Sequence, residues 1–507
     1  MKIIKRGNLK DFVSDFYVQT FSMLFFPEDS LFGKDDTGEN FIEVCADIAD
    51  MEDKANANII ISVKICYNKI VEDKTISCSL GGDSSDNPEN FKKELIVEVG
   101  KAIYAAASVL TGTKPPWGVI TGIRPAKNAE KAFEAAAGIK SKAIEILTEK
   151  YLADEKKAEL ALDVYLNAKD IIYSQHKNSA NINVNIENER DVSLYVSIPF
   201  CPTKCRYCSF VSYSTPKFLK LIPEYMQILL REIEDIGMTI KEKGLVLKTI
   251  YIGGGTPTIL DCDALDLLLG KIERCFDMQN LIEYTVEAGR PDTIDRAKLE
   301  LLARYKVDRI SINPQTLNDD ILINIGRRHT SEDFYAAYKT ARDVGIKNIN
   351  TDCIVGLIGE EKSSMIATVK KLVELEPENI TVHSLCIKKS AAIKTDGVSD
   401  DSRDSIYKPY APEVNEAVEE IYKILYKNNY LPYYMYKQKY AVGNLENTGF
   451  TKKNRECMYN IYMMDELQTI YGAGAGATTK IIYPDGRIER VINNKYPYEY
   501  IKNSRNS

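Results

Sequence analysis

Residues 195–210 read YVSIPFCPTKCRYCSF, and in this stretch an apolar, strand-like run leads directly into a close group of cysteines. The group has the spacing C-x3-C-x2-C and consists of Cys201, Cys205 and Cys208. Thiolates are the usual protein ligands of iron–sulfur clusters, and a cubane [4Fe–4S] cluster has four irons to ligate. The next cysteine is Cys262, and His176 lies upstream in a polar stretch, so no fourth ligand is close in sequence. Three thiolates would leave one iron open, and an open metal position is where a catalytic site takes its substrate.

Short strand-like runs alternate with helical patterns downstream of residue 191. The strand candidates are LYVSIPF, TIYIGGG, EYTVEAG, RISINP, NINTDCIVGL and ITVHSL. Strands that alternate with helices predict a parallel sheet in an α/β fold. Six such units with chemistry after the strands favour a partial, TIM-like (β/α)6 barrel, whose site lies at the carboxyl ends of the strands. An open doubly wound sheet is the alternative.

The chain has 507 residues, which exceeds a single typical core, so we expect two or three domains. Near the start, FIEVCADI and NIIISVKICYN predict paired strands, and FKKELIVEVGKAIYAAASVL predicts an amphipathic helix that covers them. GTKPPWGVITGIRPAK follows with the only tryptophan, Trp117, for which we expect a place in a small core. The polar residues 174–190 are typical of a linker. We therefore predict an N-terminal α+β domain over residues 1–185 and the barrel over residues 186–390.

A C-terminal extension over residues 391–507 is predicted to cover the barrel mouth. Its first part is Tyr-rich and irregular in pattern, as in PYYMYKQKYAVGNLENTGF. Its last part, TTKIIYPDGRIERVI, predicts a hairpin in which Asp485 and Gly486 supply the turn.

Composition limits the classes of function. The net charge of −7 argues against broad nucleic-acid binding. The opening MKIIKRGNLKDF lacks the apolar core of a secretory signal, and no apolar stretch reaches transmembrane length. Eleven scattered cysteines indicate reduced thiols rather than a disulfide framework. We therefore expect a cytoplasmic protein.

Polar groups and glycines follow the strand candidates. The second strand ends in Gly253-Gly254-Gly255-Thr256-Pro257-Thr258, and successive glycines let a backbone approach a ligand closely. Glu287 ends the third strand, Gln315 follows the fourth and Asp352 interrupts the fifth, while Arg327 and Arg328 follow in IGRRHT. A carboxylate within an apolar strand is costly unless it is paired or ligand-bound. Such groups at one end of the sheet would form a polar ring suited to a zwitterionic, sugar-bearing ligand.

The cysteine triad, the GGGTPT turn and the six βα units resemble the radical S-adenosylmethionine (SAM) superfamily. Over residues 190–390 the chain is similar to the oxygen-independent coproporphyrinogen III oxidase (dehydrogenase) group that includes HemN, HemW and HemZ. Two outer segments resemble the HemZ type, namely WGVITGIRPAK before the core, and MYKQKYAVGNLENTGF with YGAGAGATTK after it.

The resemblance implies a set of cofactor contacts. Cys201, Cys205 and Cys208 match the ligands of a [4Fe–4S] cluster whose fourth iron is chelated by SAM. The positions that match SAM contacts are Tyr195, Tyr207, Gly254, Gly255, Thr256, Glu287, Gln315, Arg327, Asp352 and Cys386.

The resemblance also implies an activity, an anaerobic step of haem biosynthesis. A 5′-deoxyadenosyl radical formed from SAM would abstract hydrogen from a propionate side chain of coproporphyrinogen III, and loss of CO2 and an electron would give the vinyl group of protoporphyrinogen IX. The expected partners are this small tetrapyrrole substrate and a small electron-transfer protein of flavodoxin or ferredoxin type, with no nucleic acid and no membrane span.

Two residues depart from the HemN-type pattern. Ser197 stands where HemN-type enzymes carry His, and Phe210 stands where they carry Cys, whereas HemW-type proteins share an aromatic at the latter position. A HemW-like haem chaperone and another radical SAM reaction on a tetrapyrrole (methylation or ring opening) are therefore alternatives. Candidate substrate contacts, each of which is otherwise an ordinary surface charge or a structural histidine, are Arg206, Lys388, Lys389, Lys437, His329 and His383.

Overall fold

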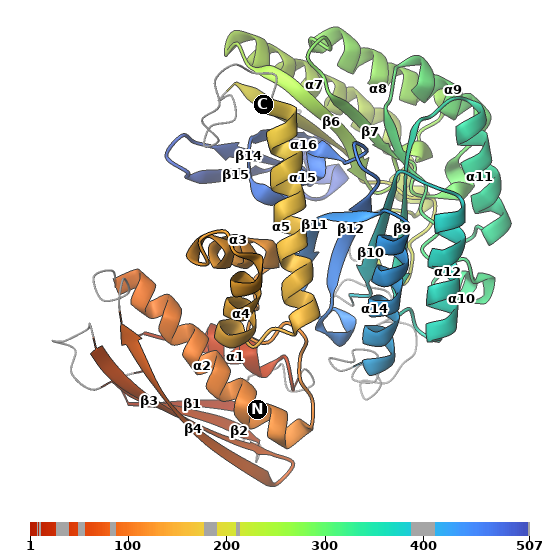
Figure 1. The fold of residues 1–507 in the computed structure, drawn as a ribbon. Helices are drawn as coiled ribbons and strands as arrows, with labels where there is room; N and C mark the ends of the chain where they lie inside the picture. Colours follow the sequence, from red (N-terminus) through yellow and green to blue (C-terminus); the bar gives the residue numbers. More distant parts are fainter. Residues whose placement is uncertain are drawn as a thin grey trace. The chain divides into compact units, whose positions relative to one another are not determined.

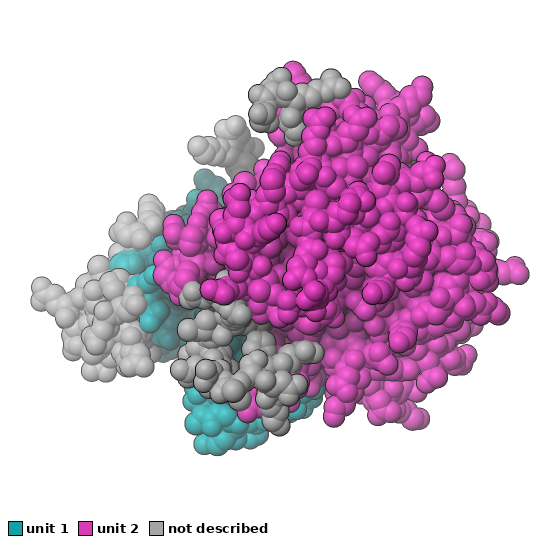
Figure 2. Space-filling model, turned by 90° about the horizontal axis from the view of Figure 1, so that it is seen from above, with its two compact units in different colours: residues 1–165, 398–415, 436–446 teal, residues 166–397, 416–435, 447–507 magenta. Residues whose placement is uncertain are grey.

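A computed structural model describes residues 1–7, 9, 12–26, 40–48, 56–81, 88–176, 190–208, 213–386 and 411–504. By contacts the chain forms two compact units, drawn in two colours in Figure 2. Unit 1 consists of residues 1–165, 398–415 and 436–446, and unit 2 of residues 166–397, 416–435 and 447–507. The two units share segments of the predicted C-terminal extension, and the division into three domains stays a prediction.

Unit 1 contains a four-stranded sheet in the order β1-β2-β3-β4. Its strands are β1 (Lys2–Gly7), β2 (Phe41–Ile48), β3 (Asn56–Tyr67) and β4 (Ile70–Gly81). The predicted pair β2 and β3 is antiparallel, and its register aligns Ile42 with Ile65 and Val44 with Val63. These four side chains are fully buried, and burying each aliphatic side chain stabilises the fold by about 1.5–3 kcal/mol. The N-terminal α+β expectation is confirmed.

Helix α2 (Pro88–Thr111) packs on this sheet, as its amphipathic pattern predicted (Figure 1). Leu95, Val99 and Ile103 are buried in one cluster with the inward side chains of β2 and β3. The other helices of this part are α1 (Asp15–Ser22), α3 (Pro125–Ala135), α4 (Lys140–Tyr151) and α5 (Glu155–His176). The start of the expected linker, residues 174–176, belongs to α5, and residues 177–189 lie outside the described residues.

Trp117 lies in the core of unit 1, as expected. Its side chain is buried, and its Nε1 donates a hydrogen bond of 2.7 Å to Glu446 Oε2. Lys157 Nζ donates to the other oxygen, Glu446 Oε1, at 2.6 Å. The two segments that resemble the HemZ type therefore meet here, because WGVITGIRPAK supplies the tryptophan and NLENTGF supplies the carboxylate.

Unit 2 is built on an eleven-stranded sheet in the order β11-β12-β10-β9-β8-β7-β6-β5-β13-β14-β15. Six strands run parallel and in chain order at its centre: β5 (Asp191–Ile198), β6 (Val246–Gly254), β7 (Glu283–Glu287), β8 (Arg309–Ser311), β9 (Asn348–Val355) and β10 (Asn379–Ser384). These are the six strand candidates of the sequence. The (β/α)6 expectation is confirmed and the doubly wound alternative is wrong, because chain order is kept across all six strands without a reversal.

Helices between the strands line the outer side of this curved sheet (Figure 1). They are α7 (Ile222–Glu242), α8 (Cys262–Cys275), α9 (Arg296–Arg304), α11 (Ser331–Asp343) and α12 (Lys362–Glu374), with the short α6 (Pro216–Leu219) and α10 (Asp319–Asn324). Helix α7 shows why these segments are helical: its buried Ile228, Leu229 and Ile233 recur at helical spacing along one face. Each helix returns the chain to the amino edge of the sheet, so the loops after the strands gather at the carboxyl edge.

The part beyond residue 411 is more regular than its sequence pattern indicated. It holds α14 (Pro412–Lys427), β11 (Leu431–Lys437), β12 (Glu446–Thr451), α15 (Met458–Asp465), β13 (Thr469–Ala473) and α16 (Pro497–Ser504). The expectation of an irregular segment is wrong, because aromatic residues there favour strands and are buried, as Tyr433 and Phe450 show. β12 pairs antiparallel with β10, and β13 pairs parallel with β5, so both ends of the six-stranded array are extended.

The predicted C-terminal hairpin is confirmed. β14 (Thr478–Ile482) and β15 (Ile488–Ile492) pair antiparallel. Gly486 has a φ of +79°, and the Asp485 side chain accepts a hydrogen bond from the Arg487 amide at 2.9 Å. A glycine after an aspartate suits such a turn because it adopts positive φ without strain. All eleven cysteines are free thiols, and none of the described helices is long and apolar enough to span a membrane.

Candidate functional site

The three cysteines of the triad lie on the loop that follows β5. The loop is held by backbone hydrogen bonds, from Cys201 N to Tyr213 O (3.1 Å) and from Cys208 N to Cys205 O (3.0 Å). Cys201 and Cys205 are buried and Cys208 is half-buried, and no disulfide joins them. Within the described part of the chain, no three His, Cys, Asp or Glu side chains gather as the ligands of a single ion would. Three sulfur donors from one loop are the soft ligands that an iron–sulfur cluster takes.

The glycine turn after β6 lies directly against this loop. Gly255 N donates to Ile198 O and Thr256 N donates to Phe200 O, both at 2.8 Å. A Cβ at Gly255 would lie 2.5 Å from the Phe200 carbonyl oxygen, so only glycine fits there. Thr256 is buried, and its Oγ1 lies 3.3 Å from Cys201 Sγ. The structure thus brings the triad and the glycine turn together, as the sequence predicted.

Glu287 ends β7 beside the glycine turn. Its Oε1 accepts a hydrogen bond of 2.6 Å from the Tyr251 hydroxyl, and a Cβ on Gly253 would lie 3.0 Å from its Oε2. Burial raises the pKa of Glu287 to about 7, and the nearby charge of Asp352 acts in the same direction. A carboxyl with a pKa near neutrality is able to exchange a proton at physiological pH.

Asp352 in β9 is held by amides that the sequence did not single out. Asn313 Nδ2 donates to Asp352 Oδ2 at 2.7 Å, and Asn350 Nδ2 donates to Asp352 Oδ1 at 2.8 Å. Burial opposes ionisation, but hydrogen bonds from His383 and Asn350 outweigh it and lower the pKa of Asp352. The carboxylate is therefore ionised and fixed in orientation.

His383 lies in β10, the strand next to β9, and its side chain contacts that of Asp352. Its Nε2 lies 3.6 Å from Asp352 Oδ2, and its Nδ1 lies 3.3 Å from Asn447 Oδ1. Burial opposes protonation, but the hydrogen bond and charge of Asp352 outweigh it and raise the pKa of His383. The imidazole thus favours its cationic form, and 25% of the side chain is exposed. Asn447 comes from β12 and lies within the segment MYKQKYAVGNLENTGF that resembles the HemZ type.

Gln315 combines backbone strain with an unsatisfied polar atom. Its φ is +68°, a left-handed conformation that costs a non-glycine residue on the order of 1–3 kcal/mol. The strain is held by two backbone bonds to β9, from Gln315 N to Asp352 O (3.0 Å) and from Ile354 N to Gln315 O (2.8 Å). The side chain is buried, and its Oε1 has no hydrogen-bond partner among the described residues. Such a residue is typical of a ligand contact.

Arg327 is also buried and incompletely paired. Its Nη1 donates to Gly289 O and its Nη2 donates to the Tyr207 hydroxyl, both at 3.1 Å, whereas Nε has no partner in the described structure. Arg327 and Tyr207 thereby connect the segment that follows β8 and α10 to the cysteine loop. The neighbouring Arg328 is exposed. His329 is buried, and burial together with the Arg327 charge lowers its pKa to about 4, so its ring is neutral.

The remaining sequence-predicted positions are placed as follows. Tyr195 stacks with Tyr251 and Tyr459, with ring centroids 6.2 and 6.3 Å away. Gly254, with a φ of +108°, ends β6 beside Ser197, and Cys386 is buried just after β10. Ser197 donates to Ala475 O at 2.9 Å, and Phe210 lies outside the described residues.

Two of the four candidate substrate cations, Arg206 and Lys437, belong to the described residues. Lys437 belongs to unit 1, where it is buried and its Nζ donates to Ile120 O at 2.8 Å. Burial lowers the pKa of Lys437 to about 7, so its interpretation as an ordinary surface charge is wrong. Arg206 is exposed, and Lys388 and Lys389 lie outside the described residues.

Arg290 is a site residue that sequence reasoning missed. It lies in the loop after β7, it is 3% exposed, and its Nη1 lies 3.5 Å from Cys205 Sγ. The signal in the sequence is weak, a single arginine three residues after Glu287 in EAGRPDT.

Comparisons with known proteins agree with this geometry. Residues 195–372 match the model of the radical SAM superfamily. The oxygen-independent coproporphyrinogen-III oxidase-like protein HemZ of Bacillus subtilis is 36% identical over 420 residues, which cover 82% of this chain and 80% of that protein. The chain belongs to the HemZ-type radical SAM family. As a radical SAM protein it uses a [4Fe–4S] cluster and SAM as cofactors.

Two other similarities frame the family. The heme chaperone HemW of Bacillus subtilis is 32% identical over 56% of this chain and 70% of its own. The structure of the Escherichia coli coproporphyrinogen III oxidase HemN, a radical SAM enzyme, matches with a TM-score of 0.51 at 22% identity, over 64% of this chain and 71% of that one. At this identity the structural match shows the fold of the HemZ-type chain.

Proposed function

We propose that this protein catalyses the oxygen-independent oxidative decarboxylation of coproporphyrinogen III to protoporphyrinogen IX. The observation that carries the proposal is the carboxyl edge of the parallel sheet, where three thiols, a glycine turn and buried polar atoms without partners among the described residues lie together. Similarity to an oxidase-like HemZ protein over four fifths of the chain supports the choice of substrate.

The cofactor contacts follow from this arrangement. Cys201, Cys205 and Cys208 would hold the cluster, and Gly254, Gly255 and Thr256 would offer backbone and hydroxyl groups to SAM. Glu287, Gln315, Arg327 and Asp352 would supply polar contacts to SAM, and Tyr195, Tyr207 and Cys386 would pack against it. When bound, the cluster and SAM supply a 5′-deoxyadenosyl radical that abstracts a hydrogen atom.

The chain's own groups orient the cofactor and substrate and keep water away. Asn313 and Asn350 fix the Asp352 carboxylate before any ligand arrives, so its orientation costs little on binding. His383, whose pKa is raised by Asp352 against the effect of burial, is a candidate partner for a propionate of the substrate. A small electron-transfer protein of flavodoxin or ferredoxin type is the proposed reductant.

A HemW-like haem chaperone is the second candidate. Ser197 bonds to Ala475 O and offers no ring nitrogen where HemN-type enzymes carry His. The 32% identity to a HemW protein also favours this alternative. A further radical SAM reaction on a tetrapyrrole, such as methylation or ring opening, has the same cofactor needs.

One anaerobic assay separates these functions. The reconstituted protein is incubated with SAM, dithionite and coproporphyrinogen III, and 5′-deoxyadenosine, CO2 and vinyl product are quantified. The decarboxylase predicts all three products, with none formed by a Cys205→Ala control. Formation of 5′-deoxyadenosine without CO2 would replace the decarboxylase by another radical reaction. Stoichiometric haem binding without SAM cleavage would support the chaperone.

A further inference from the structure

Arg290 points a charged donor at one sulfur of the cysteine triad. Its Nη1 lies 3.5 Å from Cys205 Sγ and 3.5 Å from Thr203 O. The side chain is 4% exposed, so the contact is shielded from water. Sulfur accepts hydrogen bonds at longer distances than oxygen, and this contact lies within the usual range for N–H···S.

The guanidinium is held in this orientation by Asp292. Arg290 Nε donates to Asp292 Oδ1 at 2.9 Å and Nη2 donates to Asp292 Oδ2 at 2.8 Å, a bidentate pair that leaves Nη1 facing the cysteine loop. Burial opposes ionisation of Asp292, but the bond and charge of Arg290 lower its pKa, so the pair is ionic. The Arg290 backbone is fixed too, because Thr293 N and Thr293 Oγ1 both donate to its carbonyl.

We propose that Arg290 sets the reduction potential of the cluster by donating a hydrogen bond to the Cys205 thiolate. The inference rests on the proposed assignment of Cys205 as a cluster ligand. Hydrogen bonds to the sulfurs, net charge and solvent exposure determine the potential of an iron–sulfur cluster. Reduction adds one negative charge, and a buried N–H donor stabilises the more negative state more strongly. Arg290 therefore raises the potential and eases electron entry.

The geometry separates Arg290 from the other cations near the triad. Arg327 donates to the Tyr207 hydroxyl and Gly289 O rather than to a cysteine sulfur. Arg206 adjoins Cys205 in the chain but is exposed, where water and salt screen its charge. Arg206 is thus a matched control, since its replacement removes the same charge close to the same cysteine.

The test compares Arg290→Gln, Arg290→Lys and Arg206→Gln in the reconstituted full-length protein. Iron and sulfide content and the cluster absorbance are measured first. A potentiometric titration with EPR detection of the reduced cluster, without SAM or substrate, then gives the midpoint. We expect Arg290→Gln to lower the equilibrium constant for reduction at least tenfold, which is about 59 mV for a one-electron couple. Arg290→Lys is expected to give a smaller drop, because charge remains but the fixed fork is lost.

The outcomes decide the proposal. An unchanged Arg206→Gln midpoint beside lowered midpoints for both Arg290 variants supports it. If Arg290→Lys keeps the wild-type midpoint, the hydrogen bond from Arg290 does not set the potential. If Arg206→Gln lowers the midpoint as much as Arg290→Gln does, the effect is not specific to Arg290. If Arg290→Gln binds no cluster, Arg290→Lys carries the test, and loss of cluster from both shows a structural role and overturns the proposal. Failure of the decarboxylase assay leaves these midpoints unaffected.

Discussion

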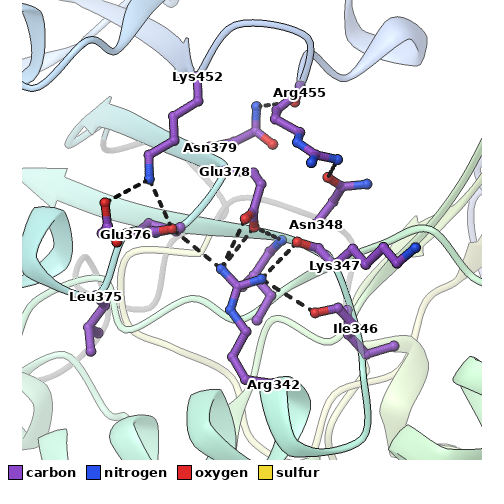
Figure 3. Close-up of polar contacts among 12 residues, drawn as sticks. Arg342, Ile346, Lys347, Asn348, Leu375, Glu376, Glu378, Asn379, Lys452 and Arg455 are labelled. Atoms are coloured by element: carbon purple, nitrogen blue, oxygen red, sulfur yellow. Dashed lines mark hydrogen bonds and ion pairs between the residues drawn. The ribbon is translucent and has the colours of Figure 1, made fainter.

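The two edges of the parallel sheet in unit 2 differ in how their charged and polar side chains are paired. At the amino edge of β9 and β10, charged side chains are paired with each other and with backbone carbonyls (Figure 3). Arg342 donates to Glu378 Oε2 at 2.9 Å and to Lys347 O at 2.7 Å, and Glu378 Oε2 also accepts from Ile349 N at 2.8 Å. At the carboxyl edge, Gln315 Oε1 and Arg327 Nε are buried without partners among the described residues.

The fold thus uses the polar groups of the amino edge for stability and keeps those of the carboxyl edge for a ligand. An ion pair and a hydrogen bond at the amino edge connect the segment after β12 to the barrel: Lys452 Nζ lies 3.4 Å from Glu376 Oε1, and Asn379 Nδ2 donates to Arg455 O at 2.9 Å. Polar groups left unpaired at the carboxyl edge cost folding free energy, and a bound ligand repays that cost. Barrels of this type place chemistry at the carboxyl edge and stability at the other.

A cavity of about 430 Å³ lies at the amino edge, lined among others by Glu283, Arg309 and Tyr433. Its buried charges are largely committed to protein groups. Glu283 accepts from the amides of Met458 and Tyr459 at the start of α15, and Arg309 donates to the Arg455 and Glu456 carbonyls. Of the nitrogen and oxygen atoms of Glu283 and Arg309, only Arg309 Nε lacks a partner in the described structure. The charges that line the cavity therefore serve stability, like the other ion pairs of the amino edge.

The largest expected effect is the loss of the cluster at the carboxyl edge. Cys205→Ala is expected to abolish the brown cluster absorbance and 5′-deoxyadenosine formation, while thermal stability of the cluster-free protein changes by about 1 kcal/mol or less. Cys262→Ala, at the half-buried start of α8, is the control and should keep both. Retention of a full cluster in Cys205→Ala would contradict the ligand assignment.

Because the pKa of Glu287 is raised, this residue is expected to lower the free energy of unfolding as the pH rises. Its pKa is about 7 in the folded chain and 4.5 in the unfolded one, so the folded state binds more protons between these values. The contribution of Glu287 to stability is therefore greatest below pH 4.5 and falls as the pH rises to 7, by at most about 3 kcal/mol. Denaturant unfolding of the cofactor-free protein at pH 5 and 7.5 is compared with Glu287→Gln, which removes this contribution. A difference between the two proteins that does not vary with pH would contradict the shift.

Breaking the amino edge is expected to affect stability alone. Glu378→Gln weakens the ion pair in which Arg342 Nη2 donates to both Glu378 oxygens, and it should lower the free energy of unfolding by about 1–3 kcal/mol. Cluster content and SAM cleavage at low temperature should stay at wild-type levels. Lys339→Gln breaks the exposed pair with Asp343 and should cost less than about 1 kcal/mol. Loss of SAM cleavage in a folded Glu378→Gln protein would contradict the proposal that the amino edge serves stability alone.

The smallest expected effect concerns the strain at Gln315. Gln315→Gly relieves the left-handed conformation and is expected to raise stability by up to about 1 kcal/mol, while loss of one ligand hydrogen bond weakens SAM binding about tenfold. Equilibrium dialysis and thermal unfolding measure the two effects. Lys306→Gly, at an exposed residue with a φ of +55°, offers the same relief away from the site and should leave SAM affinity unchanged. Equal SAM affinity in Gln315→Gly would show that the side chain does not contact the cofactor.

Local patterns were sufficient for the framework of unit 2. The six strand candidates have short apolar runs, and the spacing of Cys201, Cys205 and Cys208 is visible within eight residues. The polar residues Glu287, Gln315 and Asp352 were singled out as candidates because each stands out against an apolar strand. The hairpin of β14 and β15 was predicted, whereas β11, β12 and β13 were missed, since their tyrosines give no clear alternation and the burial of β12 and β13 depends on β10 and β5.

The αβ alternation and the cysteine spacing can be read from the sequence alone, because each is set by residues near one another in the chain. The carboxyl-edge ring is a prediction from single polar residues at the ends of successive strands. Only the tertiary structure decided that Arg290 reaches Cys205, that Asn313 and Asn350 hold Asp352, and that Gln315 is strained. Arg290 and Cys205 lie on different loops 85 positions apart, and Asn313 and Asp352 are 39 positions apart, whereas Asn350 and Asp352 share β9. Hydrogen-bond geometry between such distant groups is fixed by packing of the whole sheet, and no local pattern of residues encodes it.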